Sequence, residues 1–486
     1  MLLKIRESVN RMLKKLNAIL NVIAIIFLLV VSISITKLNI LPGKYYYPSI
    51  VLVLVMMVLF ILSIFKSDKK GLLITSIISS IVISIISSLG LIYLNSTNNL
   101  LDNISFKKEK SIYYVVVKKN SDYKELSDLD NRKLAIMENA STNYQKALKE
   151  VNKKIDVNTV KYKNVNVLAN DLITEKVDSI LLNSNSKRIL DDILKDFKNN
   201  TRIIEKISID VKQKKENVIV SNTEPFNILI SGIDTDGDIN SVSRSDVNIV
   251  MTVNPKNHEV LLTNIQRDMQ VQLHGTTGIK DKLTHAGIYG IDMSRQTIED
   301  FLDTKIPYYI RVNFDSLVKV VDSIGGVDID NDVAFKGYTR NFEVGKLHLN
   351  GKEALEYARE RKKMPSGDYT RGLHQEKIIE AIINKVTTSK KILNNYSKFT
   401  SVLDEFIQTN IPSSTIKSYV REQIDTMPSW TVISRAVDSS GSALVETYSM
   451  PGMNLYVAFP DENSVKTAST IINEMLENKK YDTINQ

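Results

Sequence analysis

The sequence lacks cysteine altogether, and its first hundred residues hold very few acidic side chains. Without cysteine among 486 residues, the protein cannot be a disulfide scaffold. Residues 1–100 contain only two acidic residues against ten Lys and Arg, whereas the other 386 residues carry 53 bases and 53 acids. The whole formal charge of +8 therefore lies in the N-terminal region. The basic charge balance therefore does not point to a surface that binds nucleic acid, and we expect no nucleic-acid partner.

Three long apolar runs follow one another in this N-terminal region, and none contains a charged residue. They are Leu16–Thr36, Ser49–Phe65 and Gly71–Leu94. Each is near or above the ~17–20 residues that a helix needs to cross the hydrocarbon core. A cleaved signal peptide would have one short apolar core with a small-residue cleavage site and no further spans. We predict three transmembrane helices over residues 16–94.

The basic residues beside these runs predict the orientation of the protein in the membrane. Five bases lie in the N-terminal tail, three lie at 66–70, and only Lys37 and Lys44 lie in the loop between them. Cytoplasmic flanks attract Lys and Arg. We therefore expect a multi-pass cell-membrane protein with residues 1–15 as a cytoplasmic tail and residues 95–486 outside. The abundance of Lys, Asn and Ile, the uncleaved anchor and the absence of disulfides favour a Gram-positive bacterium.

A repeat of serine in the third apolar run indicates close helix packing. The residues recur every four positions, at Ser76, Ser80, Ser84 and Ser88. Small side chains on one helix face let another helix approach. We favour this packing role over a polar transport path.

Residues 95–224 contain a small accessory domain and a linker. Ile112–Val117 is rich in β-branched and aromatic residues, as in a strand, and strand-like and helix-like pieces alternate after it. Residues 205–224 are polar and charged, which is typical of a linker. Over about residues 111–200 the order of pieces resembles one lobe of extracellular solute-binding proteins. A two-lobed clamp would need a second half, so packing or partner contact is favoured over ligand binding.

A second α/β domain is expected over residues 225–390, with a mixed sheet flanked by helices. Three runs rich in Val and Ile predict strands at Phe226–Ile233, Val247–Val253 and Val260–Ile265. Helices are expected near 293–303, 315–323, 352–358 and 375–386. Residues 391–486 carry few motifs, and we expect them to complete this sheet or to pack on it.

Charged side chains gather where these strands begin and end. Asp234 follows the first strand, Arg244 and Asp246 precede the second, and Arg267 follows the third. Crevices form at strand ends in α/β folds, so these side chains can face one pocket. Solvation of loops is the alternative, and it is favoured for Asp236 and Asp238.

A helical stripe gives the strongest physical argument for a buried charged site. Asp368, Arg371 and Gln375 are three and four residues apart, and the same stripe continues through three isoleucines at 378, 379 and 382. Because an apolar stripe faces the interior, the three polar residues must point inward too. A buried Arg requires nearby anions, which can be protein carboxylates or phosphates of a ligand. Arg359 and Arg361 are two apart, and an extended backbone would direct both to one side.

Short motifs over residues 226–388 together resemble the LytR–CpsA–Psr family. They are Leu229-Ile-Ser-Gly-Ile-Asp234, Arg244-Ser-Asp246, Ile265-Gln-Arg-Asp268, Asp281-Lys-Leu-Thr-His-Ala286, Val312-Asn-Phe314, Gly325-Gly-Val327, Leu355-Glu-Tyr-Ala-Arg-Glu-Arg361 and Gly367-Asp-Tyr-Thr-Arg-Gly-Leu-His-Gln375. Three apolar spans and an extra domain before the motifs resemble the capsule-associated CpsA branch. Gln266 and His374 depart from the usual pattern, but neither departure removes a charged residue of a motif.

The resemblance implies a membrane-anchored phosphotransferase of cell wall assembly. Its substrate would be a glycopolymer on a polyprenyl diphosphate carrier, with capsular polysaccharide favoured over teichoic acid, and its acceptor would be peptidoglycan. Other capsule-synthesis membrane proteins are further candidate partners.

The resemblance also implies roles for particular residues. Arg267, Asp246, Asp368 and Arg371 would be catalytic, and Asp234 and Asp246 would hold Mg²⁺, with Mn²⁺ as an alternative. The diphosphate would bind to Arg244, Arg267, Lys282, Arg359, Arg361, Arg371 and Gln375. The general base, Asp246 or Asp368, is left open. For Phe301, Phe314, Leu317 and Val321, a place in the ordinary core is favoured over a lipid tunnel.

Two other functions compete with polymer transfer. One is a phosphatase or pyrophosphatase that acts on the lipid diphosphate without an acceptor. The other is a noncatalytic membrane regulator of polymer synthesis. Direct transcriptional control is disfavoured, because about fifteen N-terminal residues and a short turn leave no room for a DNA-binding module.

Overall fold

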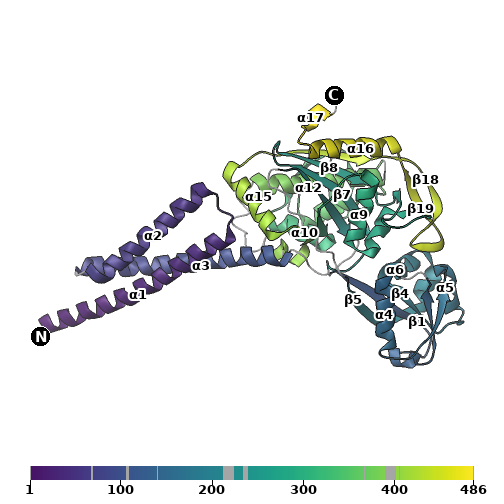
Figure 1. Ribbon diagram of the computed structural model, residues 1–486, viewed down its shortest axis with the longest axis horizontal. Helices are drawn as coiled ribbons and strands as arrows, with labels where there is room; N and C mark the ends of the chain where they lie inside the picture. Colours follow the sequence, from purple (N-terminus) through teal and green to yellow (C-terminus); the bar gives the residue numbers. More distant parts are fainter. Residues whose placement is uncertain are drawn as a thin grey trace. The chain divides into compact units, whose positions relative to one another are not determined.

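The protein consists of two compact units, and each is described separately (Figure 1). The computed structural model describes residues 2–66, 69–104, 109–138, 141–211, 224–233, 239–365, 367–388, 401–403 and 405–484. One unit comprises Met1–Ser105, Ser389–Glu405 and Ile411–Ser429. The other comprises Phe106–Thr388, Phe406–Asn410 and Trp430–Gln486.

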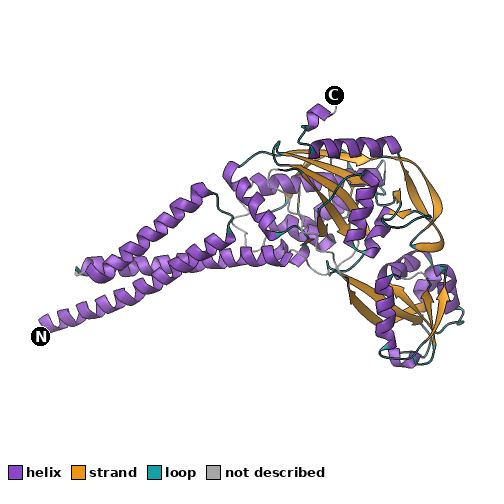
Figure 2. Ribbon diagram, viewed as in Figure 1, coloured by secondary structure: helices purple, strands orange, loops and turns teal. Residues whose placement is uncertain are grey.

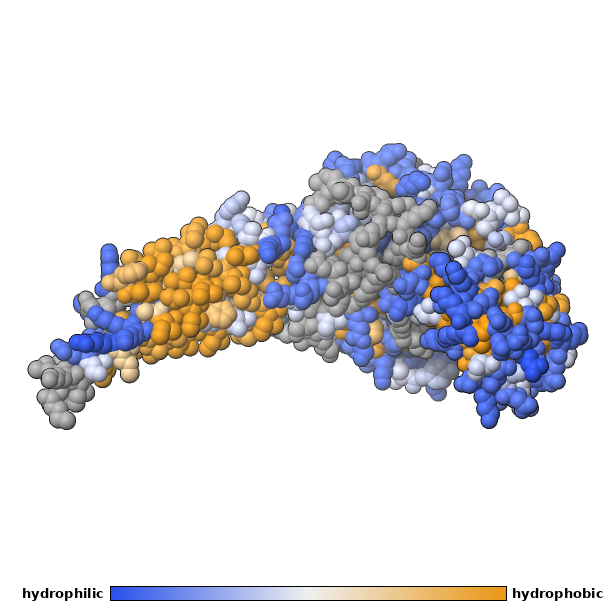
Figure 3. Space-filling model, turned by 60° about the horizontal axis from the view of Figure 1, so that its bottom comes forward, coloured by the Kyte–Doolittle hydropathy of each residue, from blue (hydrophilic) through white to orange (hydrophobic). Residues whose placement is uncertain are grey.

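The first unit contains three helices that are long and apolar enough, by length and composition, to cross a membrane. They are α1 (Leu2–Leu38), α2 (Gly43–Lys66) and α3 (Lys70–Ile104). Hydrophobic residues cover their outer surface in Figure 3. Asn21 lies buried among the three helices, where its amide nitrogen donates to Ser76 Oγ of α3 at 3.0 Å and to the Phe60 carbonyl of α2 at 3.4 Å. The predicted apolar helices are confirmed.

The serine stripe of α3 follows the helical period rather than a period of four. Ser80 is buried and Ser76 contacts Asn21, but Ser88 is exposed and Ser87 is buried in its place. At 3.6 residues per turn, a residue twelve positions on is rotated by about 120° from Ser76, whereas one eleven positions on is nearly in line. The prediction for Ser88 was wrong for this reason.

Helix α15 (Ser413–Thr426) belongs to the same unit as α1–α3. Arg421 Nε donates to the carbonyl of Asn39, just beyond the end of α1, at 3.1 Å. Asp425 forms an ion pair with Lys44 at 3.0 Å. Carbonyl groups at a helix end lack partners within the helix, so a cation there is favourable. We expected all of residues 391–486 to pack with the catalytic domain, but α15 belongs to the unit of the apolar helices instead.

Among the described residues of the second unit there are two large sheets and four two-stranded ones; strands are coloured orange in Figure 2. The accessory sheet has the order β3-β2-β4-β1-β5, in which β2 is parallel to β3 and β4, and β1 is antiparallel to β4 and β5. Its elements are β1 (Lys110–Lys118), β2 (Lys133–Met137), α4 (Thr142–Asn152), β3 (Asn158–Tyr162), α5 (Val165–Ile173), β4 (Ser179–Asn183), α6 (Ser184–Ile193), α7 (Lys195–Asn200) and β5 (Thr201–Asp210).

The first part of the predicted linker is in fact strand. Residues 205–210 form the second half of β5 and pair with β1. Ile207 and Ile209 are buried, and the exposed polar residues Lys206, Ser208 and Asp210 alternate with them. This period of two was obscured by the charge of the exposed face.

The larger sheet has the order β16-β11-β6-β7-β8-β17, with β11 parallel to β6, β17 parallel to β8, and the other pairs antiparallel. Its strands are β6 (Phe226–Ile233), β7 (Ser245–Asn254), β8 (Glu259–Ile265), β11 (Tyr308–Val312), β16 (Gln408–Thr409) and β17 (Thr431–Val437). The expected mixed sheet flanked by helices is confirmed. Both edge strands come from the region beyond residue 390.

Each face of this sheet packs against its own set of helices. Leu229 belongs to a core formed with α9 (Ile291–Leu302) and α16 (Glu462–Leu476). Ile230, the next residue, points to the other face, where α12 (Asp368–Thr388) packs through Ile379 and Ile383. Helices α10 (Phe314–Ser323) and α11 (Gly351–Arg359) lie on this second face as well. The alternation of side chains along β6 separates the two cores.

Smaller elements complete the unit. They are β9 (Gln270–Val271), β10 (Asp281–Lys282), α8 (Leu283–Ala286), β12 (Val327–Asn331), β13 (Phe335–Lys336), β14 (Asn341–Phe342), β15 (Gly345–Leu349), β18 (Ser439–Thr447), β19 (Met450–Pro460), α17 (Tyr481–Ile484) and two short 3-10 helices, Leu126–Leu129 and Gly287–Tyr289. Met450, Met453 and Leu455 of the β18–β19 hairpin pack into the core of the accessory domain.

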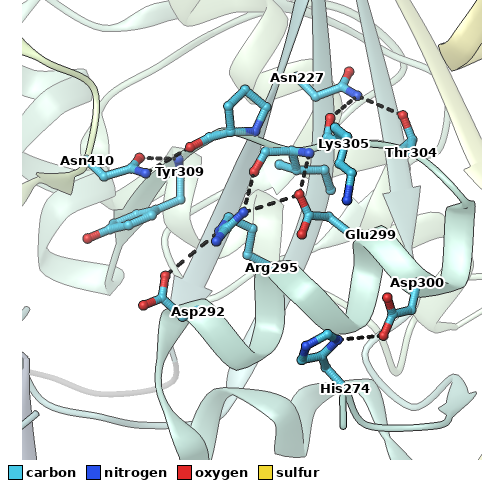
Figure 4. A network of polar contacts seen from close by, with 12 residues as sticks. Asn227, His274, Asp292, Arg295, Glu299, Asp300, Thr304, Lys305, Tyr309 and Asn410 are labelled. Atoms are coloured by element: carbon cyan, nitrogen blue, oxygen red, sulfur yellow. Dashed lines mark hydrogen bonds and ion pairs between the residues drawn. The ribbon is translucent and has the colours of Figure 1, made fainter. Parts of the chain in front are cut away.

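A polar network fixes the connection between α9 and β11 (Figure 4). Arg295 Nη1 donates to the Ile306 carbonyl at 3.0 Å, and Glu299 accepts from the Ile306 amide at 2.7 Å. Asn227 Nδ2 donates to the Lys305 carbonyl at 2.8 Å. These contacts satisfy backbone groups of the connection, so the network holds β11 in place beside β6.

A buried ion pair joins the accessory domain to the larger sheet. Arg311 of β11 contacts the carboxylate of Glu109, just before β1, and both side chains are almost fully buried. The other guanidinium nitrogen of Arg311 donates to the Ser241 carbonyl at 3.0 Å. Lys110 N donates to the Asn240 carbonyl at 2.7 Å. The start of β1 is therefore bound to the same segment as Arg311, the one that contains Asn240 and Ser241.

Candidate functional site

An ion pair between two neighbouring strands lies at the centre of the charged region. Asp246 is the second residue of β7, and Arg267 comes two residues after β8, which is antiparallel to β7. Arg267 Nη1 lies 2.5 Å from Asp246 Oδ2, with the side chains 21% and 13% exposed. Thr284 Oγ1 donates to the other oxygen of Asp246 at 2.9 Å. Both carboxylate oxygens of Asp246 are therefore held in place.

The charges around Asp246 keep it ionised. Burial alone would raise the pKa of Asp246, but Arg267, Arg244 and Arg371, with the Thr284 hydrogen bond, hold it below its usual value. Three guanidinium groups thus act on one carboxylate. Such an arrangement favours an additional anion.

A second carboxylate links Arg267 to a lysine. Asp268 Oδ2 lies 3.6 Å from Arg267 Nε, and Asp268 Oδ1 lies 2.9 Å from Lys282 Nζ. Lys282 also lies over the ring of Tyr456 at 5.9 Å. Asp268 therefore pairs with a different guanidinium nitrogen of Arg267 from the one that contacts Asp246.

The ion pair opens onto a cavity of about 710 Å³ with a strongly cationic wall. Seven cationic and three acidic side chains line it. The cations are Arg188, Arg267, Lys352, Arg359, Arg361, Lys362 and Arg371. We call this space the cationic cavity, and its charge suits a phosphorylated ligand.

An apolar cavity of about 260 Å³ adjoins the cationic cavity. It lies between the sheet, through residues such as Ile230 and Ile310, and the helices α10, α11 and α12. The residues that line both cavities are Asp246, Val247, Phe314, Leu355, Arg359 and Gln375. A ligand could therefore place a charged group in one cavity and an apolar chain in the other.

Helix α12 forms a wall of both cavities through a single stripe of side chains. Arg371 and Gln375 line the cationic cavity, and Gln375, Ile378 and Ile382 line the apolar one. Gln375 Nε2 donates to the Ala358 carbonyl of α11 at 3.3 Å. The prediction that this stripe faces inward is confirmed for Arg371, Gln375 and the isoleucines, whereas the side chain of Asp368 lies outside the described residues.

Gly372 allows α12 to approach the end of β8 closely. A Cβ atom on Gly372 would lie 2.0 Å from Asn264 Nδ2. No side chain larger than hydrogen fits in that position without a shift of the helix or of the Asn264 side chain. The glycine therefore sets how near Arg371 comes to Asp246.

The end of α11 supplies two more cations. Arg359 is the last residue of α11, and its guanidinium stacks on the ring of Phe314 with 4.0 Å between them. The backbone at Glu360 is no longer helical, with φ −65° and ψ 124°, and Arg361 follows it. Both Arg359 and Arg361 line the cationic cavity, as the extended spacing suggested.

The structure brings together six of the residues singled out in the sequence as site residues. They are Asp246, Arg267, Arg359, Arg361, Arg371 and Gln375. Neither Arg244 nor Lys282 lines the cationic cavity: Arg244 acts on Asp246 electrostatically, and Lys282 pairs with Asp268. Asp368 begins α12, but its side chain lies outside what the structure describes, as does the whole of Asp234.

Of the four apolar residues weighed for a lipid tunnel, two line the apolar cavity. These are Phe314 and Leu317. Phe301 packs against the core on the opposite face of the sheet, and Val321 is fully buried.

Sequence reasoning missed Arg188 and the role of Asp268. Asp268 stands inside a motif, but no spacing indicated that it bridges Arg267 and Lys282. Arg188 lies on α6 of the accessory domain, before the first family motif at Leu229, and only the fold brings it to the cationic cavity.

His374, one of the two departures from the family pattern, lies away from the cavities. Its ring stacks on Tyr357 with 4.0 Å between centroids, and its Nδ1 lies 3.2 Å from the Tyr357 carbonyl. Burial lowers the pKa of His374 to about 4, so the ring is neutral at neutral pH. A substitution here leaves the charge of the site unchanged.

The described residues contain no group of three His, Asp or Glu side chains that could hold a metal by itself. Asp246 offers two carboxylate oxygens, each with one hydrogen-bonding partner, so each retains acceptor capacity. Mg²⁺ commonly takes only one or two carboxylates and completes its shell with phosphate oxygens and water. The residues present fit a cation that arrives together with a phosphorylated ligand.

Comparison with known proteins finds a matching family and several similar chains. Residues 193–479 match the LytR_cpsA_psr family. A Bacillus cereus protein named polyisoprenyl-teichoic acid–peptidoglycan teichoic acid transferase TagU is 39% identical over 197 residues, which is 40% of this chain and 64% of that relative's length. The protein of the same name from Enterococcus faecalis is 35% identical over 209 residues, 42% of this chain and 68% of its own. The crystal structure of B. subtilis TagV is 31% identical and covers 53% of this chain and 99% of its own, with a TM-score of 0.44.

Proposed function

The chain belongs to the LytR_cpsA_psr family, and we propose that it transfers a glycopolymer from a polyprenyl diphosphate carrier to peptidoglycan. One observation carries this proposal: an apolar cavity shares a wall with a cavity lined by seven cations. A polyprenyl diphosphate has the matching chemistry, since an apolar chain ends in a doubly charged head group. The names of the TagU relatives, which match over 40–42% of this chain, support the same reaction class.

The polymer that we favour is capsular polysaccharide. Three apolar helices and an accessory domain precede the catalytic domain, as in the capsule-associated CpsA branch. The relatives are named for teichoic acid, which is the alternative polymer. We place the catalytic domain outside the cell membrane, because bases cluster beside the N-terminus and at 66–70. The Bacillus cereus and Enterococcus faecalis relatives favour a Gram-positive bacterium.

In the proposed reaction a sugar hydroxyl of peptidoglycan attacks the phosphorus next to the polymer. A new P–O bond forms to that hydroxyl, and the bond to the bridging oxygen of the diphosphate breaks, so polyprenyl phosphate leaves. Arg267, Arg371 and Arg359 would neutralise the nonbridging oxygens, where charge spreads in the transition state. Alignment and charge stabilisation would provide most of the rate enhancement.

The ion pair of Asp246 suggests how the two candidate bases divide their roles. A carboxylate with a lowered pKa is a weak base, and Asp246 already holds Arg267 and Thr284. We therefore assign Asp246 to orienting Arg267, and Asp368 becomes the better candidate to accept the hydroxyl proton. Asp246 together with Asp234 would hold Mg²⁺ or Mn²⁺, which would neutralise diphosphate charge when bound.

The test uses full-length protein in lipid nanodiscs with a polyprenyl diphosphate-linked glycan and peptidoglycan. We expect Arg267→Ala and Arg371→Ala each to lower transfer at least about a hundredfold, since each removes a charge-assisted contact in a desolvated site. Both peptidoglycan-bound glycan and released polyprenyl phosphate should be measured. Arg132→Ala, an exposed arginine of the accessory domain, is the matched control and should transfer normally.

The same assay separates the competing functions. Release of polyprenyl phosphate that needs no peptidoglycan would indicate a phosphatase or pyrophosphatase instead. Wild-type protein that neither releases lipid phosphate nor attaches glycan would indicate a regulator. Normal transfer by both Arg→Ala variants would overturn the site assignment.

A further inference from the structure

The accessory domain contributes a side chain to the wall of the cationic cavity. Arg188 of α6 lines this cavity together with Arg267, Arg361 and Arg371 from the catalytic domain. Its side chain is partly buried. No other residue of the accessory domain lines the cavity among the residues that the structure describes.

Contacts around α6 hold the two domains together beside this cavity. Asn185, three residues before Arg188, is buried and donates to the Val242 carbonyl at 3.4 Å. The segment that contains Val242 leads directly into Arg244 and Asp246. Lys110 of β1 pairs with Ser241 of this segment, and Val242 N donates to the Lys110 carbonyl at 2.9 Å.

A buried ion pair also connects the accessory domain to the segment that contains Ser241 and Val242. Arg311 of β11 contacts both the Glu109 carboxylate and the Ser241 carbonyl. Glu109 also accepts from the amide of Ile291 at the start of α9. A buried ion pair with these additional partners would be costly to break, so the position of α6 beside the cavity is well defined.

We infer that Arg188 is a substrate-binding residue of the catalytic site and binds phosphoryl or other anionic oxygens on the polymer side of the substrate. This inference rests on the proposed function. Arg188 lines the cationic cavity but not the apolar one, whereas Arg359 lines both. If the lipid chain occupies the apolar cavity, Arg188 faces the head group and the polymer attached to it. Its planar guanidinium can bind two oxygens at once.

A neighbouring lysine provides a matched control. Lys187 precedes Arg188 on the same helix, but it is ion-paired with Asp191 at 2.7 Å and lies over the ring of Phe197. It does not line the cationic cavity. Lys187→Ala therefore removes a cation from α6 without removing one from the cavity.

The experiment measures steady-state transfer by the full-length protein with two polyprenyl diphosphate substrates, one with a neutral glycan and one with an anionic glycan. We expect Arg188→Ala to lower kcat/KM ten- to a hundredfold, mostly through a higher KM, because a charge-assisted hydrogen bond is lost in substrate and transition state alike. Arg188→Lys should recover part of the loss, and Lys187→Ala should change kcat/KM less than about threefold.

The two substrates identify the group that Arg188 binds. An equal loss with both indicates the diphosphate, and a loss confined to the anionic glycan indicates a charged sugar near it. Unchanged KM and kcat in Arg188→Ala with both substrates would overturn the inference while transfer by the wild-type protein still supports the proposed function. A loss that Lys187→Ala reproduces would also overturn it, since that result indicates a structural role of α6.

Discussion

At the scale of single residues, the site depends on a carboxylate that orients cations rather than on a group with a raised pKa. Asp246 holds Arg267 and accepts from Thr284, and surrounding guanidinium groups lower its pKa. Arg359 is positioned in another way, by stacking on Phe314. Preorganised cations of this kind suit a reaction in which charge spreads over phosphoryl oxygens.

His374 makes the stability of the catalytic unit depend on pH. Its pKa is about 4 in the folded protein and about 6.5 in the unfolded chain. Between these values the unfolded chain binds a proton that the folded protein does not, so the contribution of His374 to the free energy of unfolding should fall as pH decreases from 6.5 to 4, with a slope of at most about 1.4 kcal/mol per pH unit. Burial raises the pKa of Glu376 to about 9, and this carboxyl contributes a slope of opposite sign between about 4.5 and 9, so the contribution of His374 is the difference between the wild-type protein and a variant without this imidazole.

Denaturant titrations of the full-length protein in detergent, followed by tryptophan fluorescence, test this expectation. The single tryptophan, Trp430, packs in one cluster with Ile379 and Ile383 of α12 and therefore reports on this helix. His374→Phe keeps an aromatic ring beside Tyr357 but cannot titrate. An acid slope that is equally steep in this variant would contradict the assignment to His374.

At the scale of secondary structure, α12 connects the two cavities. Its inward stripe runs from Arg371 through Gln375 to Ile382, so one helix provides both the charged wall and the apolar wall. Gly372 permits this position because the helix meets Asn264 at the end of β8 without a side chain between them. The close packing makes the geometry of Arg371 sensitive to a single methyl group.

We expect Gly372→Ala to displace α12 and to lower polymer transfer more than about tenfold. The cost in the free energy of unfolding should be about 1–3 kcal/mol, as for other overpacked sites. Asn264→Ala in the same chain should restore part of both losses, since it removes the atoms that the new methyl group meets. Gly441→Ala is the control, because a Cβ there would meet its nearest neighbour at an ordinary 3.9 Å.

Transfer assays and fluorescence-detected unfolding measure the two effects. Normal transfer by Gly372→Ala would show that the position of α12 does not limit the reaction.

The sequence predicted those parts of the fold and site whose signal is local. The apolar helices, the strands β6, β7 and β8, and the inward stripe of α12 all follow from runs or periods within a single segment. The second half of β5 was missed because charged residues on its exposed face hid the alternation of Ile207 and Ile209. Arg188 was missed because only tertiary contacts between distant segments bring it to the cavity.

At the scale of the catalytic unit, the accessory and catalytic domains contact each other closely, and both line the cationic cavity. The buried pair of Glu109 and Arg311 connects them, and the β18–β19 hairpin packs into the accessory core. Arg188 of the accessory domain lines the cationic cavity beside side chains of the catalytic domain. This organisation agrees with an accessory domain that takes part in substrate binding.

The central claim is that the two adjoining cavities hold a polyprenyl diphosphate. The most direct measurement is an experimental structure of the full-length protein with a polyprenyl diphosphate-linked short glycan. We predict that the prenyl chain lies between β6 and the helices α10–α12, with phosphoryl oxygens within hydrogen-bonding distance of Arg267 and Arg371. A lipid bound elsewhere, with the phosphates away from these arginines, would contradict the claim.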